Sequence, residues 1–155
     1  MSLQPSKNGI AGTVEVVKDA GALATRAAEI IAGRLRTARY PFRMVLSGGS
    51  TPRAAYQLLG CKDLDWDCAE LFFSDERFVP PDHKDSNYRM VRETLFATNL
   101  VHPRKLLAIP TDGTPQSAAD RYDETLRQQY GAGSEGPIAA NDLLARDGRS
   151  WRGIK

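Results

Sequence analysis

The chain has 155 residues, which is the size of one ordinary domain. Hydrophobic residues make up 41% and charged residues 26% of the sequence, a balance typical of a soluble globular protein and not of a disordered one. The net charge is only +2, so neither nucleic acid nor an anionic membrane is an expected partner. The sequence has no apolar run long enough for a membrane helix and no signal-peptide core, and we expect a cytoplasmic protein.

The cysteines and histidines do not form a pattern of metal ligands. Six residues separate Cys61 from Cys68, and the two histidines, His83 and His102, lie far from that pair. A structural zinc site needs four nitrogen or sulfur ligands at closer spacing. We therefore expect no metal site and two reduced thiols.

The N-terminal part of the chain predicts a lead-in, a strand and a helix. Residues 1–12 are polar and are expected to be flexible, and Thr13–Val17 carries the β-branched residues of a strand. Asp19 can cap a helix that runs to about Arg36. Its apolar residues recur at steps of three and four and are expected to face the core: Leu23, Ala27, Ile30, Ile31 and Leu35.

Three more strand–helix pairs follow. Residues 42–46, 70–74 and 105–109 are short apolar runs, which favour strands that are buried on both faces of a parallel sheet. We expect the helices to run from Pro52 to Gly60 with Thr51 as cap, from a cap at Asp85 or Ser86 to about Ala97, and from a capping pair of Ser117 and Asp120 to Gly131. The alternation predicts an α/β fold with a parallel sheet that helices cover on both faces.

The last part of the chain breaks this alternation. Residues 137–155 contain only one apolar pair, Leu143-Leu144, before a basic stretch around Trp151, and they show no pattern of a core strand. We expect an α/β domain over 13–136 that is incomplete at its C-terminal side, followed by a loosely ordered tail.

The sequence SGGSTP between a predicted strand and a predicted helix is the strongest local motif. Gly48 and Gly49 let the backbone turn sharply and approach a ligand, while Ser47, Ser50 and Thr51 add hydroxyl groups. The free N–H groups and the dipole at the start of the next helix favour an anion, so the motif predicts a phosphate cradle. The glycine-lysine ending of a P-loop and the GxGxxG dinucleotide motif are both absent. An ordinary glycine turn before a capped helix is the alternative.

Two further motifs follow the third predicted strand. In SDERFVP, Arg77 can clamp a phosphate with its planar fork, and Asp75 can orient a hydroxyl group or move a proton. In DSNY, Asn87 can form hydrogen bonds with sugar hydroxyl groups. The alternatives are a solvated charge cluster, plain helix capping by Asp85 and Ser86, and a solvated loop histidine at His83.

Long stretches around these motifs resemble one enzyme family. LSGGSTPRAAYQLL at 46–59, LFFSDERFVPPDHKDSNYRMVRETL at 71–95, and the IPTDG turn with the following AADRYDETL are similar to the 6-phosphogluconolactonases. This group also contains sugar-phosphate isomerases and glucosamine-6-phosphate deaminases. The resemblance covers residues 13–136 and implies a Rossmann-like three-layer α/β/α fold. It also implies hydrolysis of 6-phospho-D-glucono-1,5-lactone to 6-phosphogluconate in the oxidative pentose phosphate pathway, without a cofactor.

The resemblance also assigns roles to residues. Gly48, Gly49, Ser50 and Thr51 would hold the 6-phosphate, and Asp75 and Arg77 would line the pocket that faces the lactone ring. The deaminases typically have Met-Asp-Glu-Tyr after the third strand, so SDERFVP favours the lactonase branch. A sugar-phosphate isomerase or deaminase, and a non-catalytic fragment that only binds sugar phosphate, are the alternatives.

The family pattern continues with a strand and a glycine-rich turn that carries a histidine, the usual general base. This sequence has no such turn, and neither His83 nor His102 lies at a matching position. The simplest interpretation is a chain that is cut short. Since a positioned base contributes about 10²- to 10⁴-fold in rate, we expect this chain to have little or no lactonase activity.

Overall fold

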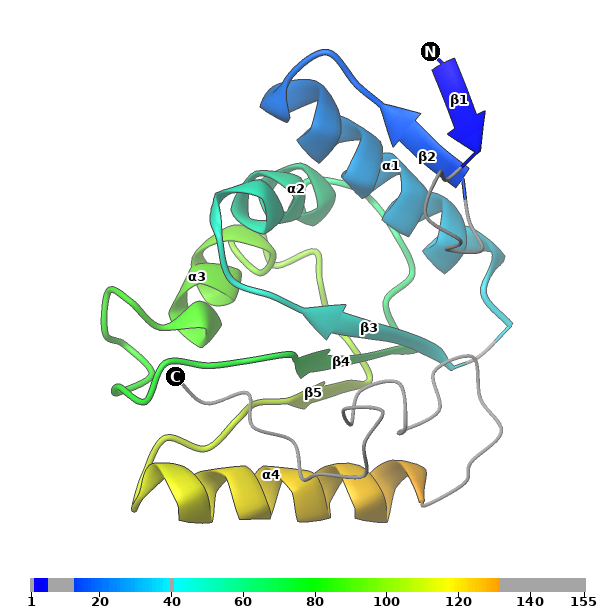
Figure 1. Cartoon of the computed structure of the whole chain (residues 1–155). Helices are drawn as coiled ribbons and strands as arrows, with labels where there is room; N and C mark the ends of the chain where they lie inside the picture. Colours follow the sequence, from blue (N-terminus) through cyan, green and yellow to red (C-terminus); the bar gives the residue numbers. More distant parts are fainter. Residues whose placement is uncertain (1, 6–12, 40, 132–155) are drawn as a thin grey trace.

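A computed structural model of the chain describes residues 2–5, 13–39 and 41–131 (Figure 1). The tail predicted for 137–155 lies outside the described residues. In chain order the elements are β1 (Ser2–Pro5), β2 (Thr13–Val16), α1 (Ala20–Thr37), β3 (Phe42–Leu46), α2 (Ser50–Gly60), β4 (Ala69–Phe73), α3 (Asn87–Thr94), β5 (Lys105–Leu107) and α4 (Pro115–Tyr130).

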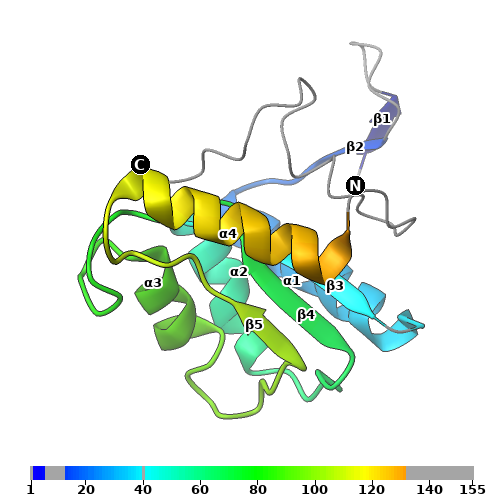
Figure 2. The ribbon, with the colours of Figure 1, turned by 90° about the horizontal axis from the view of Figure 1, so that it is seen from below.

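The centre of the fold is a parallel sheet in the order β3-β4-β5. Helices α1, α2 and α3 lie on one side of this sheet, and α4 crosses the other side (Figures 1 and 2). The predicted three-layer α/β/α arrangement is therefore confirmed. Because the strands are parallel, their carboxyl ends share one edge of the sheet, where the segments that follow β3 and β4 come together.

The first predicted strand does not belong to this sheet. β2 pairs antiparallel with β1, which lies inside the lead-in where we predicted no strand. The prediction of a fourth strand in the parallel sheet was wrong for the described residues. The physical reason is visible in the side chains, because Val14 and Val16 are 47% and 62% exposed, whereas every residue of β4 is buried.

Helix α1 begins after the predicted cap, since Asp19 Oδ1 accepts from the backbone N–H of Ala22 at 2.8 Å. Its buried stripe differs from the predicted one, and of the five predicted residues only Leu35 is fully buried. The buried residues are Ala24, Ala28, Ala32 and Leu35, while Leu23 and Ile30 are more than two-fifths exposed. The small alanines let α1 pack closely on α2, and this turns the longer side chains outward.

Two other helix starts differ from the prediction. Gly49, not Thr51, is the N-cap of α2, and no side chain caps that helix. The capping box of α4 joins Thr114 and Ser117, so the predicted pair of Ser117 and Asp120 was wrong. The other ends agree better with the sequence: Ser86 caps α3, α2 ends at Gly60, and α4 ends before Gly131 at φ +67°. Helix α3 ends at Thr94, three residues before the predicted end.

Tyr122 fastens α4 to the sheet. Its hydroxyl oxygen accepts from Phe73 N–H at 2.9 Å and lies 3.1 Å from Phe73 O and 3.3 Å from Leu107 O. The residue is 1% exposed, and burial raises the pKa of its phenol. One buried hydroxyl group therefore joins the ends of β4 and β5 to the helix below them.

Candidate functional site

The turn between β3 and α2 presents unused backbone donors. Gly49 has φ +113°, a conformation that favours glycine, and its carbonyl accepts from Arg53 N–H at 3.1 Å. In the described part of the chain, the N–H groups of Ser50 and Thr51 donate to no partner. They lie in the first turn of a helix, where the helix dipole attracts an anion. The turn therefore has free backbone donors at a helix N-terminus, and phosphate binding there stays a prediction.

The two glycines of the turn have different reasons to be glycine. A Cβ on Gly48 would lie 2.0 Å from Asn87 Oδ1, so the missing side chain makes room for Asn87. A Cβ on Gly49 would meet only Pro52 Cδ, at 3.7 Å. Open space for a ligand therefore lies over Gly49, whereas Gly48 packs against a side chain of the protein.

Ser47 is engaged within the protein. Its N–H donates to the Tyr56 hydroxyl oxygen at 3.0 Å, and burial raises the pKa of Tyr56. Its own Oγ lies 2.9 Å from Ser74 Oγ, which in turn donates to Asp75 Oδ1 at 3.0 Å. These contacts connect the glycine turn to Asp75 through two hydroxyl groups. Ser47 thus has partners within the protein for both its N–H and its hydroxyl group, and its predicted role as a donor to phosphate stays a prediction.

An open cavity of about 550 Å³ lies at this edge of the sheet. Four of the predicted site residues line it: Gly49, Ser50, Arg77 and Asn87. The other four, Ser47, Gly48, Thr51 and Asp75, are not among its lining residues. The wall also contains Arg53, Val79, Lys84, Asp85, Ser86 and Met90.

The sequence prediction missed two cations of the wall, Arg53 and Lys84. Arg53 follows Ser50 by three positions, so helical spacing puts both on one face, and this signal was available. No comparable signal exists for Lys84, because its position depends on how the loop before α3 folds. With Arg77 they give the cavity three cationic side chains, and in the described residues none of the three forms an ion pair.

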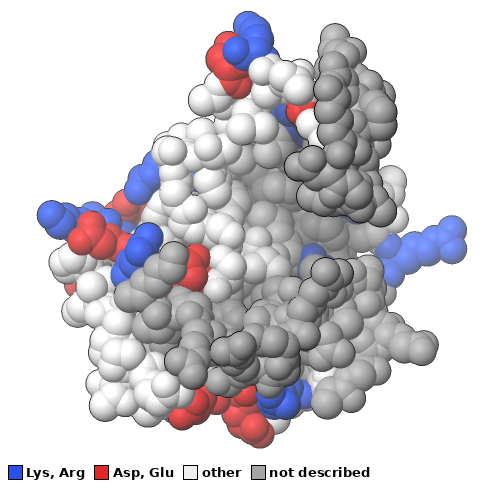
Figure 3. All heavy atoms as spheres, viewed as in Figure 1, with Lys and Arg blue, Asp and Glu red and all other residues white. Residues whose placement is uncertain are grey.

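The charge of the cavity wall is a local feature. The only carboxylate among its lining residues is Asp85, so cations exceed anions there. On the face that Figure 3 shows, basic and acidic side chains are interspersed and form no single large patch of one sign. The cavity is therefore suited to a small anionic ligand.

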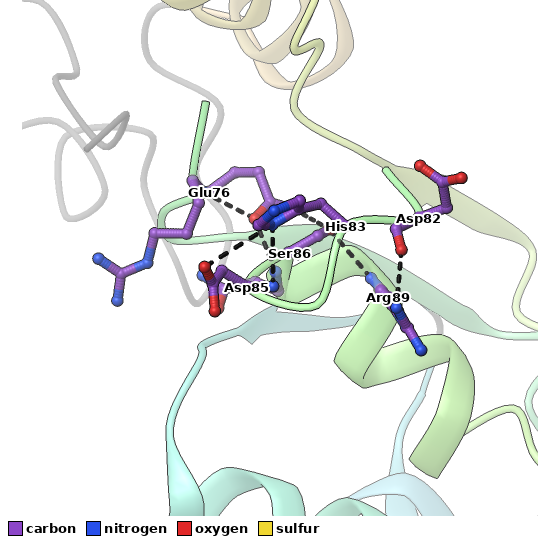
Figure 4. Close-up of polar contacts among 8 residues, drawn as sticks. Glu76, Asp82, His83, Asp85, Ser86 and Arg89 are labelled. Carbon is purple, nitrogen blue, oxygen red and sulfur yellow. Dashed lines mark hydrogen bonds and ion pairs between the residues drawn. The ribbon is translucent and has the colours of Figure 1, made fainter. Parts of the chain in front are cut away.

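The loop between β4 and α3 contributes residues to the cavity wall, and Figure 4 shows the polar contacts within it. Glu76 lies inside it and accepts hydrogen bonds from backbone and hydroxyl donors. Asn87 is 6% exposed, and its Nδ2 donates to Asp75 O at 3.0 Å, so its amide nitrogen is already engaged. His83 contacts Asp85, with Nδ1 accepting from the Asp85 N–H at 3.2 Å, and it does not line the cavity.

The described residues hold no group of three or more metal-ligating side chains, and none of their helices is long and apolar enough to span a membrane. The arrangement of this site is therefore one of backbone donors, cations and polar side chains. Such a site can bind a phosphorylated small molecule and stabilise negative charge.

Known proteins share this sequence and fold. A family model described as glucosamine-6-phosphate isomerases/6-phosphogluconolactonase matches residues 18–145. A 6-phosphogluconolactonase of Nostoc sp. is 36% identical over 136 residues, which are 85% of this chain and 56% of the relative. The crystal structure of a 6-phosphogluconolactonase from Shewanella baltica is 34% identical with a TM-score of 0.61, over 71% of this chain and 48% of that one.

The matches cover most of this chain but only about half of each relative. The relative from Rhizobium meliloti is 31% identical over 113 residues, which are 71% of this chain and 49% of that protein. The chain thus spans about half the length of the curated relatives that it matches. Since the family model covers most of the chain, and the predicted resemblance is confirmed, the chain belongs to the glucosamine-6-phosphate isomerase/6-phosphogluconolactonase family.

Proposed function

We propose that this chain supplies the phosphate-binding part of a 6-phosphogluconolactonase active site, which hydrolyses 6-phospho-D-glucono-1,5-lactone to 6-phosphogluconate. The observation that carries the proposal is the cavity at the carboxyl edge of the sheet, where the free backbone donors of a glycine turn meet three cations. The names of the relatives, 6-phosphogluconolactonases at 30% identity and above, support the same reaction.

In this proposal the 6-phosphate lies over Gly49, at the start of α2. It accepts from the free N–H of Ser50, and Arg53 and Lys84 contribute positive charge from two sides of the cavity. Both effects are strongest for a doubly charged anion close to a helix N-terminus. The sugar portion then extends toward Arg77 and the loop before α3.

Hydrolysis adds water to the lactone carbonyl carbon and then breaks the bond from that carbon to the ring oxygen, which takes up a proton. Negative charge develops on the carbonyl oxygen in the transition state, and a guanidinium fork such as that of Arg77 stabilises it. Asp75 accepts from Ser74 and does not line the cavity, so in this proposal it supports the site without touching the ring. Neither histidine of the sequence lines the cavity, so no described histidine is placed to act as the general base.

The binding part of the proposal is tested by titrating the chain with 6-phosphogluconate and following backbone amide signals by NMR. We expect saturable binding with shifts at Gly49, Ser50 and Arg77, and none with gluconate, which lacks the phosphate. Arg53→Gln should weaken binding by about tenfold, the effect of one lost contact to a charged group, while Arg36→Gln in α1 should not. Equal affinity for gluconate would contradict the proposal.

The catalytic part is tested by assaying turnover of the lactone and of glucosamine 6-phosphate separately, with correction for spontaneous lactone opening. We expect lactone hydrolysis slower than that of a full-length relative by about 10²- to 10⁴-fold, the contribution of a positioned base. Turnover of glucosamine 6-phosphate alone would identify a deaminase instead. Tight binding of 6-phosphogluconate with no turnover of either compound would identify a non-catalytic binding protein.

A further inference from the structure

Glu76 is a buried carboxylate between two residues of the candidate site, Asp75 and Arg77. It is 3% exposed, and in the described part of the chain its oxygens contact no cationic side chain. A buried charge without a counter-ion is costly unless hydrogen bonds replace the lost water. Glu76 meets this condition, because four donors satisfy its two carboxylate oxygens.

The four donors come from the two ends of the loop. Oε1 accepts from Arg77 N–H and from Asn87 N–H, each at 2.7 Å. Oε2 accepts from Tyr88 N–H at 2.8 Å. It also accepts from Ser86 Oγ at 3.2 Å (Figure 4). The backbone donors of Asn87 and Tyr88 belong to the first turn of α3, where a carboxylate also gains from the helix dipole.

The same bonds fix the wall of the cavity. Arg77, Ser86 and Asn87 all line it, and each is bonded through its backbone or hydroxyl group to Glu76. Asp75 is included as well, because its carbonyl accepts from Asn87 Nδ2 at 3.0 Å. Gly49, Ser50 and Arg53 form none of these bonds, although Gly48 packs against Asn87.

From this geometry we propose that Glu76 is a positioning residue, which holds the cavity residues Arg77 and Asn87 in place to bind the sugar portion of the ligand. The proposal rests on the proposed function for the identity of that ligand. Glu76 does not touch the ligand, since it does not line the cavity. Its effect should therefore be larger on the sugar portion than on the phosphate, because the main phosphate donors, the Ser50 N–H and Arg53, form no bond with Glu76 or its partners.

A carboxylate is required at this position because all four partners are donors. In Glu76→Gln an NH₂ group replaces one of the carboxylate oxygens, each of which accepts two hydrogen bonds. An NH₂ group cannot accept, so two donors of the loop lose their acceptor. Glu76→Asp keeps the charge but shortens the side chain by one methylene group. Glu93→Gln is the matched control, because Glu93 is a carboxylate on α3 that pairs with Arg89 at 2.6 Å and is 46% exposed.

The experiment compares affinities for inorganic phosphate and for 6-phosphogluconate in the full chain and these variants. Glu76→Gln should weaken 6-phosphogluconate binding by about tenfold or more and phosphate binding by less than about twofold, where tenfold corresponds to about 1.4 kcal/mol. Glu76→Asp should lose less affinity, but again more for 6-phosphogluconate than for phosphate. If the Gln variant does not fold, the Asp variant provides the test. An equal loss for both ligands, no loss for either, or the same loss in Glu93→Gln would overturn the inference.

A second measurement needs no ligand. Amide protons that donate to a carboxylate resonate downfield, so Glu76→Gln should move the signals of Arg77, Asn87 and Tyr88 upfield, and Glu93→Gln should not. If the wild-type chain binds no 6-phosphogluconate, the proposed function fails. An upfield shift of these amide signals in Glu76→Gln would then still support Glu76 as the positioning residue of the loop. Unmoved signals would overturn the inference whatever ligand the chain binds.

Discussion

The contact between Gly48 and Asn87 allows a quantitative test of how the glycine turn is built. In Gly48→Ala the new Cβ would lie 2.0 Å from Asn87 Oδ1, 2.6 Å from Cγ and 2.9 Å from Nδ2. Asn87 has little freedom to move, because it is buried, begins α3 and donates to Asp75 O. The methyl group must therefore displace the Asn87 side chain and break this hydrogen bond.

We expect Gly48→Ala to reduce the free energy of unfolding by about 2–4 kcal/mol. Overpacking contributes about 1–3 kcal/mol and the lost hydrogen bond about 1 kcal/mol. Asn87→Ala alone should cost about 1–2 kcal/mol, since it leaves the Asp75 carbonyl without its donor. The double variant has space for the new methyl group, so it should be about as stable as Asn87→Ala alone, and the coupling energy should then equal the cost of Gly48→Ala, about 2–4 kcal/mol.

Urea unfolding of the wild type, both single variants and the double variant measures this coupling. Gly33→Ala is the matched control: a Cβ at Gly33, within α1, meets nothing within 4 Å. There, replacing a helical glycine should stabilise the chain by up to about 1 kcal/mol. A Gly48→Ala variant as stable as wild type, or single effects that add to within about 0.5 kcal/mol in the double variant, would refute the reasoning.

Three further predictions concern the site and its support. Ser74→Ala removes the hydroxyl group that donates to Asp75 and should weaken 6-phosphogluconate binding by about 0.5–1.5 kcal/mol in calorimetric titration; unchanged affinity would show that Asp75 does not depend on this bond. Arg77→Lys keeps the charge but loses the planar fork and should cost about 1–3 kcal/mol of the same binding energy; wild-type affinity would make Arg77 a solvated loop charge. Tyr122→Phe should lower the free energy of unfolding by about 1–3 kcal/mol, because Phe73 N–H loses its acceptor. Burial raises the pKa of Tyr122 above its ordinary value of 10.0. The stability that the protonated phenol contributes is therefore complete below pH 10 and is lost as the pH rises further. The urea midpoint of the wild type should fall more steeply above pH 10 than that of Tyr122→Phe, and parallel curves would contradict this.

The parts of the fold that depend on local sequence were predictable. The apolar run of β4 and the caps at Asp19, Ser86 and Gly131 each express a preference of a few neighbouring residues, and the structure contains all of them. The sheet partner of β2 was not predictable in this way, because pairing is decided by which face of a strand finds a core. β-branched residues alone do not carry that information.

The candidate site divides along the same line. A glycine turn before a helix is a local signal, and Gly49 and Ser50 line the cavity as expected. That Gly48 instead accommodates Asn87 depends on two segments meeting in space, and the sequence shows only that both residues are present. Lys84 reaches the cavity wall through the fold of the loop before α3, and the same loop buries Glu76, a residue that looked like part of a solvated charge cluster.

The bond from Tyr56 to Ser47 has a consequence for the order in which the molecule assembles. This bond joins residues nine positions apart, and the Glu76 bond to Asn87 joins residues eleven apart. The bond between Ser47 and Ser74 spans 27 positions, and that between Phe73 and Tyr122 spans 49. Because closing a longer loop costs more chain entropy, each half of the cavity is expected to order within its own segment first. The two halves of the cavity are then expected to pair through Ser47 and Ser74. Helix α4 is expected to dock last, so the glycine turn forms before Tyr122 bonds to the end of β4.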